Sequence, residues 1–203
     1  MSKSLRVVFM GTPAFAVPGL LSIVESHHEV VGVVTAPDRP AGRGRKRHFS
    51  AVKEAALEHN ILLLQPEKLS SKQTVSQLKA LNADVFVIVA FRMLPKIIWE
   101  LPKLGTFNLH ASLLPQYRGA APIHWSIINR EKTYGLTTFL IDDKIDTGSI
   151  LLQKKLGILP QDTMGTLNNR MQAHSGDLII ATLNGLQSGS IKPIPQKETA
   201  AIK

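Results

Sequence analysis

The sequence contains no cysteine and no long apolar run. Without cysteine among its 203 residues, the chain can form neither a disulfide nor a thiolate nucleophile, which fits the cytoplasm without requiring it. No apolar stretch approaches the roughly 20 residues that span a bilayer, and the N-terminus lacks a signal-peptide pattern. We therefore expect a cytoplasmic protein that does not cross a membrane.

Signatures for nucleotides and metals are also missing. There is no P-loop and no HExxH helix, and the seven histidines are scattered without metal-ligand spacing. Gly11 begins the turn where dinucleotide-binding proteins carry G-x-G-x-x-G, but Pro13 stands at the second glycine position and no glycine stands at or next to the third, near Val17. We predict no metal site and no NAD site.

Acidic residues are few, with 15 Asp and Glu against 24 Lys and Arg, so the net charge is +9. This excess favours a polyanionic partner only weakly, because it also serves solubility. The length allows one substantial core, and residues 1–187 are predicted to form one functional domain. The polar residues 188–203, which include two prolines, are predicted to be a linker.

Short apolar runs alternate with segments of helical periodicity along most of the chain. Strands are expected over 5–10, 29–35, 62–64, 83–90 and 106–109, and helices after Pro13 and over 51–59, 71–81, 120–128 and 162–186. Two later runs, 135–141 and 149–155, are joined by a loop too short for a crossover helix. The predicted class is α/β, a Rossmann-like, mostly parallel twisted sheet with helices on both faces and a C-terminal antiparallel strand pair.

Asn108 and His110 stand at the end of a predicted strand. Side chains alternate along a strand, so these two point the same way. A carboxamide that can donate a hydrogen bond then lies beside an imidazole that can take or give a proton. The alternative for either residue alone is a polar side chain satisfied by nearby backbone groups.

Asp146 is the third catalytic candidate, because it lies in a loop at another strand end and could orient His110. Asp142 and Asp143 are rivals in the same loop. All three could instead serve ordinary turn chemistry. The Asp-Thr-Gly sequence also occurs in aspartic proteases, but that chemistry needs two facing copies in a β-rich fold, and this α/β pattern has one.

Five stretches of the sequence stand out together: FMGTPAFAVPGL, APDRPAGRGRKR, FRMLPK, FNLHASLLPQYRGAAPI and IDDKIDTGSIL. With them, the chain resembles the methionyl-tRNA formyltransferases from about residue 7 to residue 190. N-x-H with a later D-T-G marks the wider 10-formyltetrahydrofolate transferases, and PDRPAGRG with RGAAPI narrows the resemblance to the tRNA enzymes. The family often has Tyr-Gly where Phe91 and Arg92 stand here, and commonly a glycine in place of Ala111.

The resemblance implies transfer of a formyl group from 10-formyltetrahydrofolate to methionyl-initiator tRNA, without a metal, in translation initiation. Asn108 would donate a hydrogen bond to the formyl oxygen, and His110, oriented by Asp146, would stabilise charge or move a proton. The folate co-substrate would lie along Phe91, Arg92, Met93, Leu94, Ser112, Leu113, Leu114, Pro115 and Asp142. The family also has a C-terminal β-barrel domain, which the linker would lead to, and we expect a monomer.

The segment from Pro37 to His48 is strongly basic, with only Asp38 opposing its cations. Guanidinium groups suit phosphate oxygens. The cations expected to bind tRNA are Arg39, Arg43, Arg45, Lys46 and Arg47. Alone, such a run is usually a solvated flexible loop; with the resemblance, we expect a loop that becomes ordered on tRNA.

Two other functions are compatible with the sequence. A formyltransferase that acts on a small amine, such as a nucleotide sugar or glycinamide ribonucleotide, would share Asn108, His110 and Asp146. A non-catalytic RNA-binding module would explain the basic segment but would leave the Asn-His pair without a role.

Overall fold

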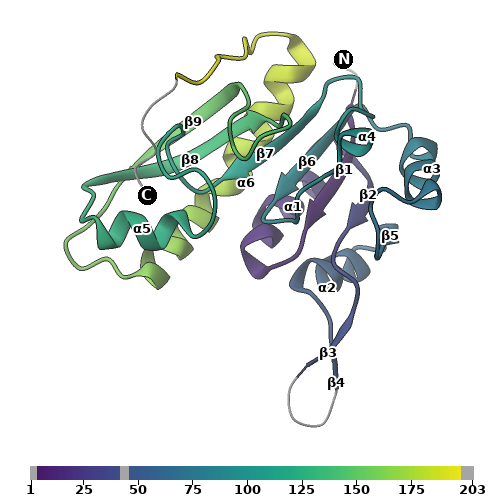
Figure 1. Cartoon of the computed structure of the whole chain (residues 1–203), viewed down its shortest axis with the longest axis horizontal. Helices are drawn as coiled ribbons and strands as arrows, with labels where there is room; N and C mark the ends of the chain where they lie inside the picture. Colours follow the sequence, from purple (N-terminus) through teal and green to yellow (C-terminus); the bar gives the residue numbers. More distant parts are fainter. Residues whose placement is uncertain (1–3, 42–45, 198–203) are drawn as a thin grey trace. The chain divides into compact units, whose positions relative to one another are not determined.

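The structure is a computed structural model that describes residues 4–41 and 46–197. The chain divides into two compact units, Met1–Thr106 and Phe107–Lys203. Figure 1 shows the elements of each unit. Among the described residues, no helix has the length and apolar character that a membrane span requires.

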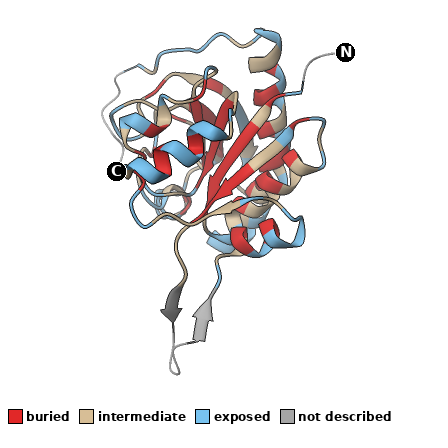
Figure 2. Cartoon of the chain, turned by 90° about the vertical axis from the view of Figure 1, so that its right-hand side faces the viewer, coloured by how far each residue is buried: buried red, intermediate tan, exposed pale blue. Residues whose placement is uncertain are grey.

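The first unit contains a parallel sheet with the strand order β5-β2-β1-β6. Its strands are β1 (Arg6–Gly11), β2 (Glu29–Val34), β5 (Leu63–Leu64) and β6 (Val85–Val89). All of β6 and most of β1 are buried, and such strands appear red in Figure 2. A strand covered on both faces excludes polar side chains, which explains the continuous apolar runs.

Helices follow the strands of this unit. They are the short 3₁₀ helix η1 (Ala14–Ala16), α1 (Val17–Val24), α2 (Ala51–Glu58), α3 (Lys72–Ala80) and α4 (Lys96–Trp99). α1 packs beside α2, and α3 beside α4. The chain moves outward from β1 through β2 to β5 and then returns past β1 to β6. Right-handed crossovers therefore place α3 on the face opposite to α1 and α2.

The second unit contains an antiparallel sheet with the order β7-β8-β9. Its strands are β7 (Thr106–His110), β8 (Thr133–Leu140) and β9 (Ile150–Gly157), and its helices are α5 (Pro122–Ile128) and α6 (Met164–Ser188). α6 packs on β8 and β9, and α5 contacts α6. The loop between β8 and β9 and the segment between β7 and α5 carry the candidate site.

The predicted α/β fold class is confirmed, including the parallel strands and the C-terminal antiparallel pair. Four elements were not predicted: η1, α4, and the two strands of the antiparallel pair β3 (Arg39–Ala41) and β4 (Lys46–His48). η1 and α4 are too short to show a period, and β3 and β4 are basic rather than apolar. Residues 42–45 lie outside the described residues. The domain boundary at residue 187 remains a prediction.

Asp162 fixes the start of α6. Its Oδ2 accepts from the Leu159 N–H at 2.7 Å and from the Arg170 guanidinium at 2.5 Å, and its Oδ1 accepts from the Thr166 hydroxyl at 3.0 Å. The Leu159 N–H lowers the pKa of Asp162, and the Thr166 and Arg170 contacts act in the same direction against burial. The ionised carboxylate therefore stabilises the folded state.

We expect Asp162→Asn to lower the free energy of unfolding by about 1–3 kcal/mol at pH 7, since it weakens hydrogen bonds to a charged acceptor. The folded pKa lies below the unfolded value of about 3.9, so this stabilisation is present above that value and is lost as pH falls through the folded pKa. Urea unfolding at several pH values measures the difference. Asp177→Asn, at an exposed position of α6, is the control. A loss that stayed constant into acid would contradict this account.

Candidate active site

Two polar side chains share one face at the end of β7. Asn108 and His110 are separated by one residue, so they point to the same side of the strand. In the antiparallel register they pair with Phe139 and Thr137 of β8. His110 is 7% exposed, and its ring meets Phe139 edge-on with centroids 6.5 Å apart. Packing therefore restricts the orientation of the imidazole.

The carbonyl of Tyr117 holds the His110 ring. The distance from His110 Nε2 to the Tyr117 carbonyl oxygen is 2.8 Å. A carbonyl oxygen only accepts, so Nε2 carries a proton and Nδ1 is the nitrogen left to gain or lose one. Asp146 is the residue predicted to orient the ring, but the contact with the Tyr117 carbonyl is shorter than the one with the Asp146 carboxylate.

Asp146 faces the other ring nitrogen. Its Oδ2 lies 3.6 Å from His110 Nδ1, which is longer than an ordinary hydrogen bond. The two groups attract as an ion pair only when the ring carries its second proton. The same Oδ2 accepts from the Gly119 N–H at 2.8 Å. The His110 and Asp146 side chains are 8% and 15% exposed, so little water screens the pair.

Asp146 and residues of the turn at 117–121 have a left-handed backbone conformation. Tyr117, Ala121 and Asp146 have φ angles of 57°, 54° and 54°, a region that non-glycine residues seldom occupy. Gly119 has φ of 90°, which suits glycine. Such conformations cost about 1–3 kcal/mol each and persist where surrounding contacts hold them. The shape of the turn at 117–121 is therefore part of the site.

The Tyr117 side chain anchors this turn. Its hydroxyl donates to the Glu131 carboxylate at 2.5 Å and accepts from the Asn129 amide at 3.1 Å. Burial, helped by the hydrogen bond to Glu131, raises the pKa of the Tyr117 hydroxyl. The phenol therefore stays neutral and fixes the backbone whose carbonyl contacts His110.

The Asn108 carboxamide has an unmatched atom. Its Oδ1 is buried and has no hydrogen-bond partner within residues 4–41 and 46–197. A half-turn of a carboxamide exchanges its oxygen and nitrogen, so either atom can take this place. An unpaired buried polar group costs about 1–3 kcal/mol, and such groups in folded proteins call for a functional explanation. Asn108 is therefore a group that a ligand could satisfy.

The aspartates in the loop between β8 and β9 have different surroundings. Asp142 accepts from the Thr147 hydroxyl at 2.8 Å, whereas its rival Asp143 is exposed. A Cβ at Gly148 would lie 1.6 Å from the Leu140 carbonyl oxygen, so the loop needs glycine there. Asp142 thus has a turn role in this structure, and its contact with folate remains a proposal.

The segment Ser112–Pro115 is fixed by β8 and β9. The buried Thr137 hydroxyl donates to the Ser112 carbonyl at 2.6 Å and accepts from the Leu114 N–H at 3.1 Å. The Gln153 amide donates to the Leu114 carbonyl and to the Thr137 hydroxyl, both at 2.9 Å. These hydrogen bonds therefore define the backbone of the predicted folate-binding segment.

The remaining predicted folate-binding residues lie in the first unit, after β6. Leu94 is buried, Phe91 is half-buried and Met93 is 70% exposed. The Arg92 guanidinium donates to the carbonyl oxygens of residues 66 and 67 and lies 5.6 Å from the centroid of the Phe91 ring. Arg92 is therefore held by the loop that follows β5.

Comparison with known proteins identifies the family. Residues 5–183 match the family described as formyl transferase. The chain belongs to the formyl transferase family. It is 52% identical over 201 residues to methionyl-tRNA formyltransferase from Flavobacterium johnsoniae, covering 99% of this chain and 64% of that relative. It is 48% identical over 198 residues to the enzyme of that name from Bacteroides fragilis, covering 98% and 61%.

A solved structure shows the same fold as this chain. Phosphoribosylglycinamide formyltransferase from Bacillus halodurans aligns with a TM-score of 0.74 and 27% identity, covering 91% of this chain and 96% of that one. In contrast, the chain spans 64% and 61% of the two curated relatives.

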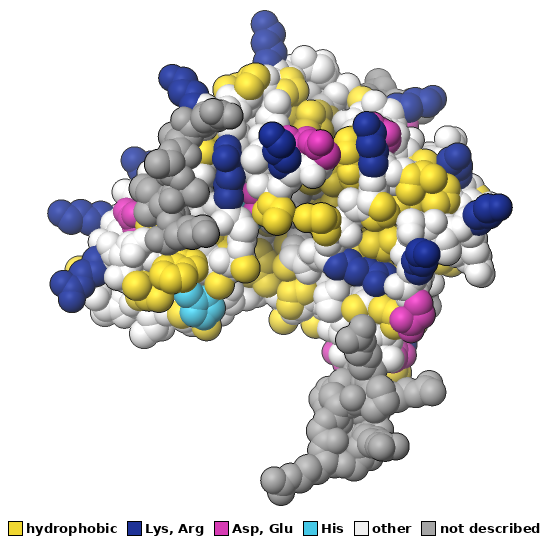
Figure 3. All heavy atoms as spheres, viewed as in Figure 1, with side chains coloured by type: hydrophobic (Ala, Val, Ile, Leu, Met, Phe, Trp, Pro, Cys, Tyr) yellow, Lys and Arg dark blue, Asp and Glu magenta, His cyan; other side chains and the backbone are white. Residues whose placement is uncertain are grey.

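The predicted tRNA-binding cations fall on the β3–β4 segment. Arg39 lies on β3, and Lys46 and Arg47 lie on β4. Arg43 and Arg45 lie outside the described residues. Elsewhere, Figure 3 shows Lys and Arg dispersed over the face in view rather than gathered in one patch. On the face in view, the cations therefore do not form a single patch.

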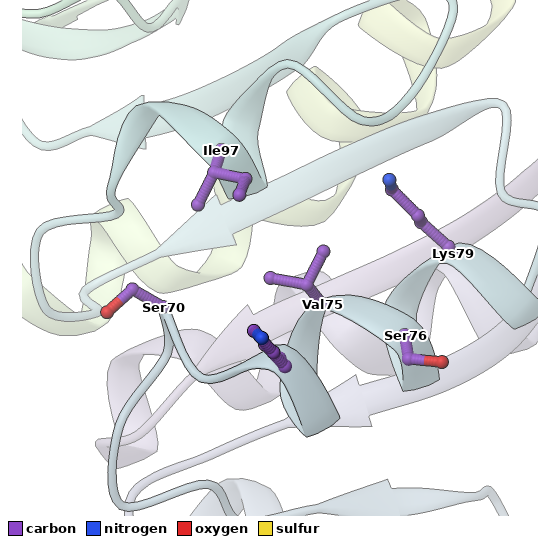
Figure 4. A pocket seen from close by; sticks show the side chains of 6 residues that line it. Ser70, Val75, Ser76, Lys79 and Ile97 are labelled. Carbon is purple, nitrogen blue, oxygen red and sulfur yellow. The ribbon is translucent and has the colours of Figure 1, made fainter.

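A hollow in the first unit is lined by serine, lysine and aliphatic side chains. Figure 4 shows it beside α3 and α4. Its lining residues are Ser70, Lys72, Val75, Ser76, Lys79 and Ile97. None of the predicted site residues lines it. Among the described residues there is also no group of three or more His, Cys, Asp or Glu placed to hold a metal ion.

The groups that hold the proposed catalytic residues were not predicted from the sequence. The Tyr117 carbonyl and the Gly119 N–H are backbone groups, and the type of amino acid at a position does not indicate where its backbone groups point. Thr137 and Gln153 resemble ordinary strand residues, and only their pairing across strands shows the network around Ser112–Pro115. The left-handed turn had one visible signal, the glycine at position 119.

Proposed function

We propose that this chain carries out formyl transfer from 10-formyltetrahydrofolate to the α-amino group of methionyl-initiator tRNA. The main support is its 52% identity over 99% of its residues to a methionyl-tRNA formyltransferase. The buried carboxamide atom of Asn108 and the facing His110 and Asp146 side chains supply suitable chemistry. The proposal extends to translation initiation in the cytoplasm. A monomeric state and the absence of metal and membrane binding remain predictions.

Asn108 would stabilise charge on the formyl oxygen. Negative charge builds on that oxygen when an amine attacks the formyl carbon. The Asn108 carboxamide, turned so that its unpaired atom is the N–H₂ group, could donate a hydrogen bond to it. A preorganised donor of this kind contributes about 10²–10³-fold in rate.

His110 would hold or move a proton at Nδ1. The Tyr117 carbonyl occupies Nε2, so only Nδ1 can exchange a proton with the reacting groups. When Nδ1 is protonated, the Asp146 carboxylate stabilises the imidazolium. A strong base is unnecessary, because an α-amino group has a pKa of about 7.7–8.0 and is partly free near neutral pH.

The substrates would contact several described segments. Ser112–Pro115, Phe91–Leu94 and Asp142 are proposed to contact the folate, with apolar walls from leucine and phenylalanine and backbone groups for the pterin edge. The residues present fit this use, since hydrogen bonds with Thr137 and Gln153 hold the backbone of Ser112–Pro115 in place. The basic β3–β4 segment is proposed to contact tRNA.

Formylation assays test this proposal. With 10-formyltetrahydrofolate as donor, we expect this chain to formylate methionyl-initiator tRNA. Asn108→Ala or His110→Ala should lower turnover by about 10²-fold or more while donor affinity changes much less, because both act on the transition state. Thr138→Val is the control, since its buried hydroxyl bonds Thr182 of α6 at 2.8 Å instead. Unchanged turnover in both site variants would refute the assignment.

A small amine is the second candidate acceptor. The likeness to a phosphoribosylglycinamide formyltransferase at 27% identity favours it, since that likeness covers 96% of that enzyme. The assay separates the two: formylation of glycinamide ribonucleotide or an amino sugar nucleotide, with none of charged tRNA, would favour the small amine. Failure to bind a 10-formyltetrahydrofolate analogue would leave an RNA-binding module as the better reading.

For the basic segment, we expect replacement of Arg43, Arg45 and Arg47 by Ala to weaken tRNA binding and flatten its salt dependence, because fewer counterions are released. Binding measured at several salt concentrations gives the slope. The matched control replaces Lys72, Lys79 and Lys154 by Ala. These three residues are exposed, and their replacement removes the same charge. An unaltered slope in the arginine variant, or an equal change in both, would count against this contact.

A further inference from the structure

The Gln196 side chain joins the two loops that contact His110. Its Nε2 donates to the carbonyl oxygens of Asp146 and Gly148, at 2.9 Å and 2.8 Å. Its Oε1 accepts from the Arg118 guanidinium, at 3.1 Å from Nε and 2.7 Å from Nη2. One carboxamide thus uses both its donor and its acceptor groups to bridge two separate segments.

Both segments control the proposed catalytic pair. Arg118 lies between Tyr117, whose carbonyl holds Nε2 of His110, and Gly119, whose N–H holds the Asp146 carboxylate. On the other side, Gln196 binds the carbonyl of Asp146 itself. Asp146 has a left-handed backbone, which needs contacts from its surroundings to persist. Gln196 provides such contacts.

The segment that carries Gln196 is docked in the second unit. Ile194 and Ile150 form an antiparallel bridge, with an N–O distance of 2.8 Å in both directions. Ile191 covers Gly185 of α6 so closely that a Cβ at Gly185 would lie 2.3 Å from its Cδ1. Residues 191–196 fall in the range predicted to be a linker, yet they contact β9 and α6.

We propose that Gln196 is a positioning residue, which ties the Asp146 loop to the turn at Arg118 and so fixes Asp146 against His110. This inference rests on the proposed formyl transfer and extends its machinery to a residue that does not touch the reacting atoms. Misplacement of a catalytic group by about 1 Å can cost up to about 10²-fold in rate. Loss of the bridge therefore lowers turnover without removing any catalytic group.

Two substitutions distinguish the hydrogen bonds to Arg118 from those to the Asp146 loop. Gln196→Ala removes both sets. Gln196→Glu keeps an acceptor for Arg118 but loses the N–H donors and sets a carboxylate against the carbonyls of Asp146 and Gly148. Ile194→Ala is the control, since that side chain is 61% exposed and its bridge to Ile150 uses only backbone groups.

Kinetics in the full chain give the first readout. We expect both Gln196 variants to lose about tenfold or more in kcat, with KM for donor and acceptor much less changed, while Ile194→Ala keeps the wild-type kcat. Full activity of Gln196→Ala would overturn the proposal. Full activity of Gln196→Glu would also overturn it, since the donors to the Asp146 loop would then be dispensable. An equal loss in Ile194→Ala would show a general packing effect and overturn it too.

The His110 ring signals in NMR spectra give a readout that does not need activity. We expect the ring ¹⁵N and ¹H shifts to move in both Gln196 variants and to stay in place in Ile194→Ala. If the wild-type chain formylates no acceptor but these shifts move, the proposed function fails while the positioning contact stands. If the wild-type chain is active and the shifts do not move in either Gln196 variant, the positioning role is wrong.

Discussion

The hydrogen bond from His110 Nε2 to the Tyr117 carbonyl determines how the rest of the site can act. Because a carbonyl cannot donate, this 2.8 Å contact decides which ring nitrogen bears a fixed proton and which one faces Asp146. A side-chain partner could change its protonation state with pH, whereas a backbone carbonyl cannot. The chemistry of the imidazole is therefore set by the conformation of one turn.

That conformation depends on contacts from several parts of the second unit. The Tyr117 phenol is held near the end of α5 by Glu131 and Asn129, and Gly119 supplies the φ of 90° that lets its N–H reach Asp146. On the other side, Gly148 lets the Asp146 loop close against the end of β8. The turn at 117–119 and the loop that carries Asp146 thus meet at the His110 ring, and two of the left-handed residues, Tyr117 and Asp146, face it.

The sequence predicted the parts of this arrangement that side chains encode. The run VFVIV and the alternation of apolar strands with helices led to the α/β class, and the spacing of Asn108 and His110 placed them on one strand face. The sequence did not predict β3, β4 and α4, because a basic hairpin and a single helical turn carry no apolar period. Residues 188–203 are predicted to be a linker because they are polar and include two prolines. These features do not reveal the Ile194 bridge or the Gln196 contacts. The groups that orient His110 are backbone atoms, whose positions follow only from the folded chain.

The most direct test of the account is ¹⁵N NMR of the His110 ring in the wild-type chain, at a pH where the ring is neutral. The contact with Tyr117 predicts that Nε2 carries the proton and that Nδ1 has the chemical shift of an unprotonated nitrogen. A proton on Nδ1, facing Asp146, would mean that the carboxylate rather than the turn orients the ring. That result would contradict the central claim.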